Sequence, residues 1–165
     1  MTTMEAPVHP TQTDTAIAKH MFEHHATMVA ELDRLTAVLR GAAPEGQLAA
    51  HTDLAEWFES VLVPHADEEE SMTYRAAAGL PEGRLLIQAM VREHELIKHL
   101  VALFIESEFT VAAAYAHAIF EVFKSHQAKE NEVIIPLLLK AADISLAEVV
   151  GAGHRHQPGD HGHRH

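Results

Sequence analysis

The sequence predicts an all-α protein, an antiparallel up-down four-helix bundle followed by a short C-terminal helix. Apolar residues recur at three- and four-residue spacing over four long segments, as on the buried face of an amphipathic helix. Breaks that contain Gly or Pro separate the first three segments. The period-two alternation of a half-buried strand is sparse. Four amphipathic helices joined by short links pack as an antiparallel bundle.

The first two expected helices are separated by the break RGAAPEG. The first runs from about residue 14 to residue 40, and the second from about residue 47 to residue 78, where AGLPEG ends it. Pro64 lies inside the second helix. Because proline lacks the amide hydrogen and crowds the preceding turn, it predicts a kink or a local break there.

The third expected helix begins near Pro81, since proline suits the first turn of a helix, and ends around ESEF at residues 106–109. The fourth runs from about residue 110 to residue 142. A short capped helix follows in DISLAEVV, with Asp143 or Ser145 as its N-cap.

The chain divides into three parts. Residues 1–11 are expected to form a flexible leader, residues 12–150 the bundle, and residues 151–165 a disordered His-rich tail. The tail is polar and interrupted by Gly and Pro, a composition that cannot build a packed core. The 165 residues are enough for one domain with its own core.

Composition narrows the classes of function. A formal net charge of -12 argues against nucleic acid or an anionic membrane as a partner, because both require a basic surface. The chain has no Cys, which excludes disulfides and thiolate metal sites. Its start resembles no signal peptide, and no apolar run approaches the ~18 residues of a membrane span. We therefore expect a cytoplasmic protein.

Histidine is the unusual feature, with 15 copies of which five lie in the tail. Residues four apart share a helix face, so the apolar stripes predict which histidines point inward. Each expected helix carries one, and the second and fourth add a carboxylate one turn later. The inward set is His24, His65 with Glu69, His94, and His126 with Glu130.

Internal repetition decides two ambiguous positions. FEHH resembles REHE, which favours His24 over its neighbour His25 as the inward residue, although both flank the stripe. HADEEESMTYR resembles HQAKENEVIIP, and the position that matches Glu68 is Lys129, which favours Glu69. The other acidic residues of this run, including Glu70, are expected on a solvated face.

Six buried imidazoles and carboxylates need a partner, since an unpaired buried polar group costs several kcal/mol. Two metal ions satisfy all six, because imidazoles donate nitrogen lone pairs and two carboxylates can bridge both ions. A sulfur-free mixture of this kind suits iron, manganese or zinc.

The ordered pattern of one His, His-x-x-x-Glu, one His and His-x-x-x-Glu resembles the hemerythrin-like (HHE cation-binding) family, over about residues 14–140. The resemblance implies a non-haem centre of two iron ions with an oxo or hydroxo bridge. It implies O2, peroxide or NO as ligand. The oxygen carriers of this family have a fifth His where this chain has Lys98, so the chain is similar to a four-His, two-Glu subgroup.

The missing ligand has three candidates: water, His20 one turn before His24, and Tyr74. Relatives of this subgroup use a tyrosine in a place similar to that of Tyr74, which by helix phase points away from His65 unless the helix is distorted. An open position favours a catalase-like activity that dismutates peroxide. The alternatives are non-enzymatic sensing of O2, NO or iron, metal storage, and metal handling in which the tail delivers zinc or nickel.

The chain also supplies a control. His117 and Glu121 form a third His-x-x-x-Glu, and His117 lies nine residues from His126, about half a turn round the helix. We therefore expect His117 on the outer face.

Overall fold

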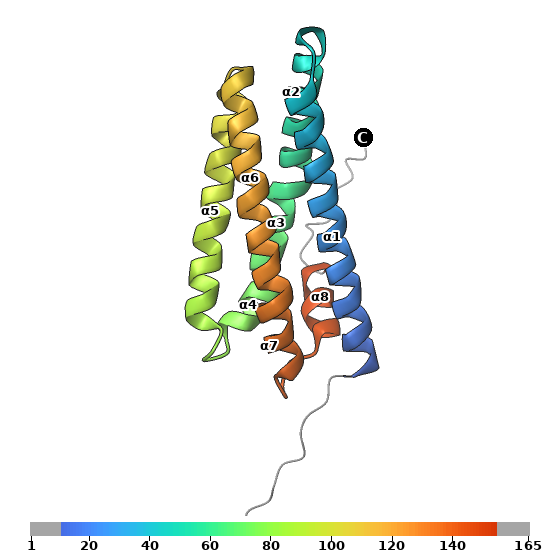
Figure 1. Ribbon diagram of the computed structural model, residues 1–165. Coiled ribbons are helices and arrows are strands. Elements are labelled where there is room, and N and C mark those ends of the chain that lie inside the picture. The colour runs from blue at the N-terminus through green and yellow to red at the C-terminus, as the bar shows by residue number, and fades with distance from the viewer. Residues whose placement is uncertain (1–10, 155–165) are drawn as a thin grey trace, which may run out of the picture.

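The computed structural model describes residues 11–154, with side chains described as far as residue 151, and its regular elements within that range are all helical. These helices form four columns that pack together, and the columns lie side by side along the long axis of the molecule (Figure 1). This confirms the prediction of an all-α bundle. The expected leader, apart from Thr11, lies outside the described residues, as does the tail from residue 155 onward.

The first column is the single helix α1 (Gln12–Gly41), and the third is α5 (Arg84–Glu106). The second and fourth columns are interrupted. The second, after the short turn η1 (Pro44–Gly46), consists of α2 (Gln47–Trp57), the π-helix η2 (Phe58–Leu62), α3 (Val63–Ser71) and α4 (Thr73–Ala78). The fourth consists of α6 (Phe109–Lys129), the π-helix η3 (Glu130–Ile134) and α7 (Ile135–Lys140), and α8 (Leu146–His154) follows it.

Both π-helices end two residues before a proline. Pro64 and Pro136 each occupy the second position of the α-helix that follows. Proline has no amide hydrogen and its ring crowds the preceding turn, so the turn before it widens. The kink expected at Pro64 takes this form.

A sharper break occurs at Met72, which has φ -118° and ψ -88° and separates α3 from α4. The sequence predicted a helix that continues through this position to residue 78, and that prediction is wrong. The departure from helical geometry rotates α4 relative to α3, and the side chain of Tyr74 is buried as a result, at 1% exposure.

The apolar core forms two clusters, one toward each end of the bundle. One is built around Phe58, Phe104 and Phe123, and the other around Met90 and Ile134. Between these clusters each column carries buried polar side chains instead of apolar ones. The fold therefore places a polar layer between two apolar regions of the bundle core.

Helix α8 packs across α1 and α4 (Figure 1). Its N-terminus is held by α1: the carboxylate of Asp14 accepts hydrogen bonds from Ala147 N at 3.3 Å and from Ser145 Oγ at 3.4 Å. Ser145, one of the two residues expected as the cap, directly precedes the helix, and its carbonyl accepts a hydrogen bond from Val149 N at 3.0 Å. The side chain that accepts from the amide of Ala147 belongs instead to the distant Asp14. The helix also extends to His154, four residues into the segment predicted to be disordered.

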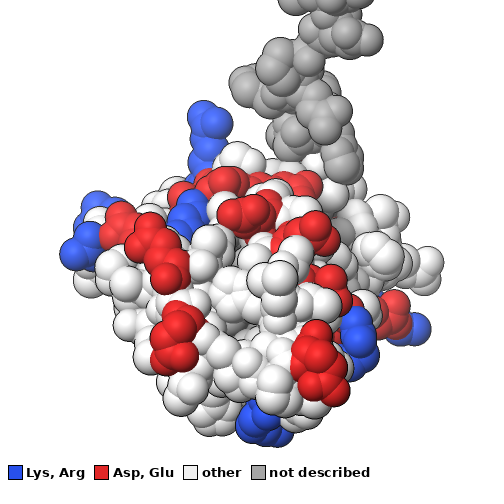
Figure 2. All heavy atoms as spheres, turned by 90° about the horizontal axis from the view of Figure 1, so that it is seen from above, with Lys and Arg blue, Asp and Glu red and all other residues white. Residues whose placement is uncertain are grey.

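No helix within residues 11–154 combines the length and the apolar character that crossing a membrane requires. Seen from above, Asp and Glu side chains outnumber Lys and Arg around the end of the bundle (Figure 2).

Candidate metal centre

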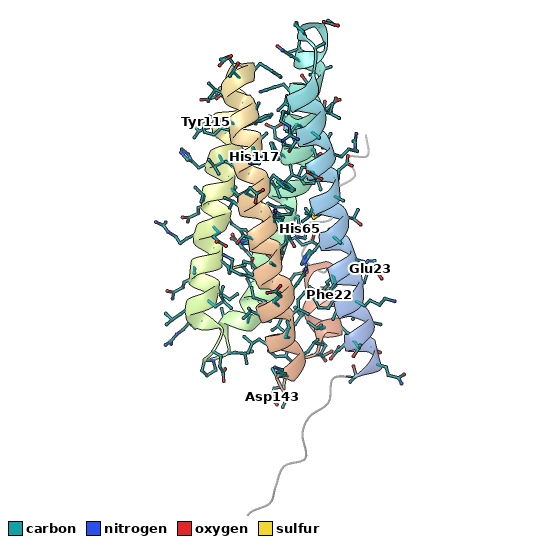
Figure 3. The ribbon with its side chains drawn as sticks, in the orientation of Figure 1. Phe22, Glu23, His65, Tyr115, His117 and Asp143 are labelled. Atoms are coloured by element: carbon teal, nitrogen blue, oxygen red, sulfur yellow. The ribbon has the colours of Figure 1, made fainter. Side chains whose placement is uncertain are left out.

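The polar layer brings imidazoles and carboxylates from all four columns to one point. Two groups have ligand atoms within 4.8 Å of one another, and both contain Glu69 and Glu130. The first group adds His25 and His65, and the second adds His94 and His126. His65 lies at mid-height in the bundle (Figure 3). Each of these two overlapping groups could hold a metal ion, and the two groups share both carboxylates.

The π-helices flank this point. Glu130 is the first residue of η3, and His65 follows η2 and Pro64. A π turn shifts the residues beyond it round the helix axis, and such turns are frequent at functional sites. His117, on the same column as Glu130 but nearer the other end, is exposed as predicted (Figure 3).

The structure places His25 in the position for which the sequence favoured His24. His25 is 4% exposed and its Nε2 lies 3.4 Å from Glu130 Oε2. His24 is exposed, and its ring lies 5.3 Å from that of His65 at the edge of the group. The buried stripe of α1 includes Ala18 and Met28, which lie seven residues before and three residues after His25. That spacing, rather than the match between FEHH and REHE, decides the inward residue.

Tyr74 reaches the same point because of the break at Met72. Its hydroxyl donates a hydrogen bond to Glu130 Oε1 at 2.5 Å and lies 2.8 Å from Nε2 of His126. Its ring stacks on that of His94, with centroids 5.0 Å apart and planes 8° apart. His20, the other side chain considered for this role, is exposed.

Three of the histidines are oriented by a hydrogen bond at Nδ1. His94 Nδ1 lies 2.8 Å from Glu70 Oε1, and His126 Nδ1 lies 2.8 Å from Glu93 Oε2. The partner of His25 Nδ1 is Asn131 Oδ1, at 2.6 Å. Such bonds fix the ring so that Nε2 faces the centre, and partners of this kind accompany histidines that bind metals.

These three partners were not identified from the sequence, and Glu70 was expected on a solvated face. The side chain of Glu70 is only 33% exposed and bonds His94. A signal was available, because each partner is the sequence neighbour of a cluster residue: Glu70 follows Glu69, Glu93 precedes His94, and Asn131 follows Glu130. A neighbour lies about 100° round the helix and so meets a ring on the next column.

Comparison with known proteins agrees with this arrangement. A family model described as the Hemerythrin HHE cation binding domain matches residues 16–138. The chain belongs to this family. No curated protein and no solved structure matched the chain. The matched segment contains both ligand groups, and it ends before the helix α8, which begins at Leu146.

The two buried carboxylates of the cluster differ in how readily they ionise when no metal is bound. Burial, together with the neighbouring Glu130 carboxylate, raises the pKa of Glu69 well above its usual value. Burial also opposes ionisation of Glu130, but Glu69 and His126 outweigh it and lower the pKa of Glu130. The pair therefore tends to share one proton, and a cation that binds there competes with that proton.

Several of these buried atoms also form no hydrogen bond of acceptable geometry. They are His65 Nε2, both carboxylate oxygens of Glu69, and Glu130 Oε2, although His65 Nε2 contacts Glu69 Oε1 and His25 Nε2 lies 3.4 Å from Glu130 Oε2. An unsatisfied buried polar atom costs about 1–3 kcal/mol. All of these atoms carry lone pairs that a cation accepts, so the donor set fits the metal ions that the hemerythrin family implies.

Burial favours the neutral, metal-binding form of two of the imidazoles, those of His65 and His94. Burial lowers the pKa of His65 to about 4. Burial also lowers the pKa of His94, and this effect outweighs the hydrogen bond from His94 Nδ1 to the Glu70 carboxylate, which raises that pKa. Neutral rings with a free Nε2 lone pair are the form of histidine that coordinates metals.

One cavity of about 250 Å³ connects this centre with the surface of the hemerythrin fold. Its inner wall contains His25, His65 and Glu69, and its outer part contains His24 and Val150 of α8. The cavity reaches the centre at His25 and His65, so a small molecule that enters the cavity meets these two histidines first.

Proposed function

We propose that this hemerythrin-family protein holds a non-haem diiron centre with an oxo or hydroxo bridge. At this centre it binds or reduces a small ligand such as O2, peroxide or NO. The observation that carries the proposal is the pair of ligand groups that share Glu69 and Glu130. Two carboxylates buried side by side among imidazoles are costly without cations and favourable with them.

The proposed ligands divide into two sets around the shared carboxylates. One ion would be held by His94 and His126 with Tyr74 as a further ligand, and the other by His25 and His65. His25 replaces His24 in the set expected from the sequence, because its ring is the buried one. Zinc and manganese suit the same donors, and the family favours iron.

The protein's part in the chemistry follows from these placements. When bound, a pair of iron ions supplies electrons to a small oxidant or accepts them from it. His94 and His126 would be held in one orientation by Glu70 and Glu93, which requires no reorganisation during a reaction. The apolar clusters above and below the layer exclude bulk water.

A catalase-like activity is the specific reaction we propose, in which two peroxide molecules become one O2 and two waters. The cavity that reaches His25 and His65 is large enough for peroxide. The acidic surface repels anionic oxidants and leaves neutral ones unaffected.

The experiment is metal analysis of protein produced with iron supplied, combined with its visible spectrum before and after peroxide is added. About two irons per chain, with an oxo-bridged near-ultraviolet band that changes while peroxide is consumed and O2 evolves, is the expected result. Zinc alone, or a folded helical protein without metal, would count against the proposal.

The second candidate is a sensor or a store without catalysis. A surface groove of about 430 Å³ between α1 and α6 is lined by His25 and Asn131, so a change at the centre could be read from outside. Two bound irons that do not turn over peroxide, but whose spectrum responds to O2 or NO, would favour this candidate over the enzyme.

A further inference from the structure

The two halves of the centre differ in the charge of the groups that hold their histidines. In one half both Nδ1 partners are carboxylates: Glu70 holds His94 and Glu93 holds His126. Glu93 is also ion-paired with Lys129, which keeps it in place as an anion. Both imidazoles of this half therefore have an anionic partner.

In the other half neither of the equivalent positions is a carboxylate. Asn131, five residues after His126, corresponds in the repeated motif to Glu70, five residues after His65. It holds His25 Nδ1 through an amide oxygen.

The second equivalence concerns the residue before the inward histidine. His24 precedes His25 as Glu93 precedes His94, and the ring of His24 lies 5.3 Å from that of His65. Where one half has two carboxylates, the other has an amide and an imidazole.

The histidines of the first half are also more deeply buried than those that line the cavity in the second half. His94 and His126 are 3% and 1% exposed, and Tyr74 covers them from within the bundle. The side chain of His65 is 14% exposed, and it lines the cavity together with His25.

We propose that the two metal positions are inequivalent, which rests on the proposed two-ion centre. The position at His94 and His126 fills first and retains its ion. The position at His25 and His65 binds more weakly and exchanges its ion through the cavity. An anionic Nδ1 partner makes an imidazole a stronger donor and adds attraction for the cation, and such partners change metal affinity about 10–100-fold. Asn131 is accordingly a positioning residue that weakens one of the two positions.

The test loads the full chain with ferrous iron under anaerobic conditions, adds an excess of a ferrous chelator, and follows release at constant pH. Wild-type protein is expected to lose one ion in a fast phase and one in a slow phase. Asn131→Asp, which gives His25 an anionic partner, slows the fast phase by about tenfold, and Glu93→Gln accelerates the slow phase by about tenfold.

Two matched variants control for charge alone. Glu132→Gln changes a charge in the same groove as Asn131, and Glu95→Gln changes one on the same helix as Glu93, where it pairs with Arg92. Neither is expected to change either phase. Helical circular dichroism of each variant shows whether it is folded.

A second measurement does not depend on release. With one equivalent of ferrous iron, His65→Ala is expected to bind with the affinity of the wild-type protein, whereas His94→Ala binds more weakly. Release of two ions in one phase, or an Asn131→Asp effect confined to the slow phase, would overturn the inequivalence and leave the diiron proposal standing. Fewer than two ions before the chelator is added would overturn both.

Discussion

The hydroxyl oxygen of Tyr74 lies 2.8 Å from Nε2 of His126, although 52 residues separate the two along the chain. A helix that continued through residue 72 would turn Tyr74 away from His65, its neighbour on the same column. The backbone at Met72 leaves helical geometry and aims the phenol into the polar layer. The break is therefore part of how the centre is built.

Replacement of this phenol tests its role as a ligand. In Tyr74→Phe the ring still stacks on His94, but the hydroxyl that bonds Glu130 is lost. If the phenolate binds iron, the ferric wild-type protein has a visible charge-transfer band that the variant lacks. We expect loss of that band with no more than one ion lost per chain, measured by absorption and metal analysis. Tyr115→Phe, on α6 away from the centre, serves as the control.

The adjacent pair on α1 allows a direct comparison of a buried and an exposed histidine. His25→Ala removes a ring that is 4% exposed and lies beside Glu130, so we expect the metal content to fall by about one ion per chain. His24→Ala removes an exposed ring, and we expect unchanged metal content. Metal analysis of the two variants side by side decides the assignment, and the reverse result would return it to His24.

Hydrophobic periodicity was sufficient to predict the bundle, its four columns and the layer where histidines gather. Periodicity resolves a face of the helix but not one residue within it, because His24 and His25 both border the stripe of α1. The burial of Ala18 and Met28 identifies His25 as the inward residue, and this burial is a property of the packed structure.

Features that depend on backbone irregularity were harder to predict. Pro64 predicted a distortion, but nothing in the local sequence predicts that the helix breaks at Met72. The hydrogen bond that Asp14 accepts at the start of α8 depends on how the first and last helices pack against each other. The hydrogen bonds of Glu70 and Glu93 likewise cross between columns, so they follow from packing rather than from spacing along one helix.

Stability of the metal-free protein is expected to depend on pH through His65. Burial lowers the pKa of His65 to about 4, so its neutral form is favoured in the folded state. The unfolded chain binds a proton below about 6.5, and this contribution to stability is therefore lost as the pH falls from about 6.5 to about 4. Since one pKa unit corresponds to about 1.4 kcal/mol, the loss is roughly 3.5 kcal/mol at most.

The measurement is urea unfolding of metal-free protein at a series of pH values. His65→Gln is expected to flatten the change between about pH 6.5 and about pH 4, whereas His117→Gln, an exposed residue, leaves it intact. Equal slopes in wild-type protein and His65→Gln would show that other groups cause the acid sensitivity.

The His-rich tail is tested by removal. The ligand groups lie wholly within residues 25–130, so a chain that ends at His154 is expected to hold as many ions at equilibrium as the full chain. Metal analysis after dialysis measures this. Equal final content with slower loading would favour delivery of metal by residues 155–165, and loss of an ion would mean that the tail supplies a ligand.

Glu69 offers the sharpest separation of stability from function. Burial and Glu130 raise its pKa, so the folded metal-free protein holds a proton there that the unfolded chain releases above about pH 4.5. Stability from this group is therefore lost as the pH rises, and Glu69→Gln, which cannot ionise, is expected to stabilise the metal-free protein at neutral pH by about 1–3 kcal/mol.

The same change removes a shared carboxylate and should abolish binding of at least one ion. Thermal unfolding with and without metal, with Glu68→Gln as the neighbouring control, measures both effects. A Glu69→Gln protein that is less stable without metal than the wild type would show that the carboxylate is satisfied within the protein.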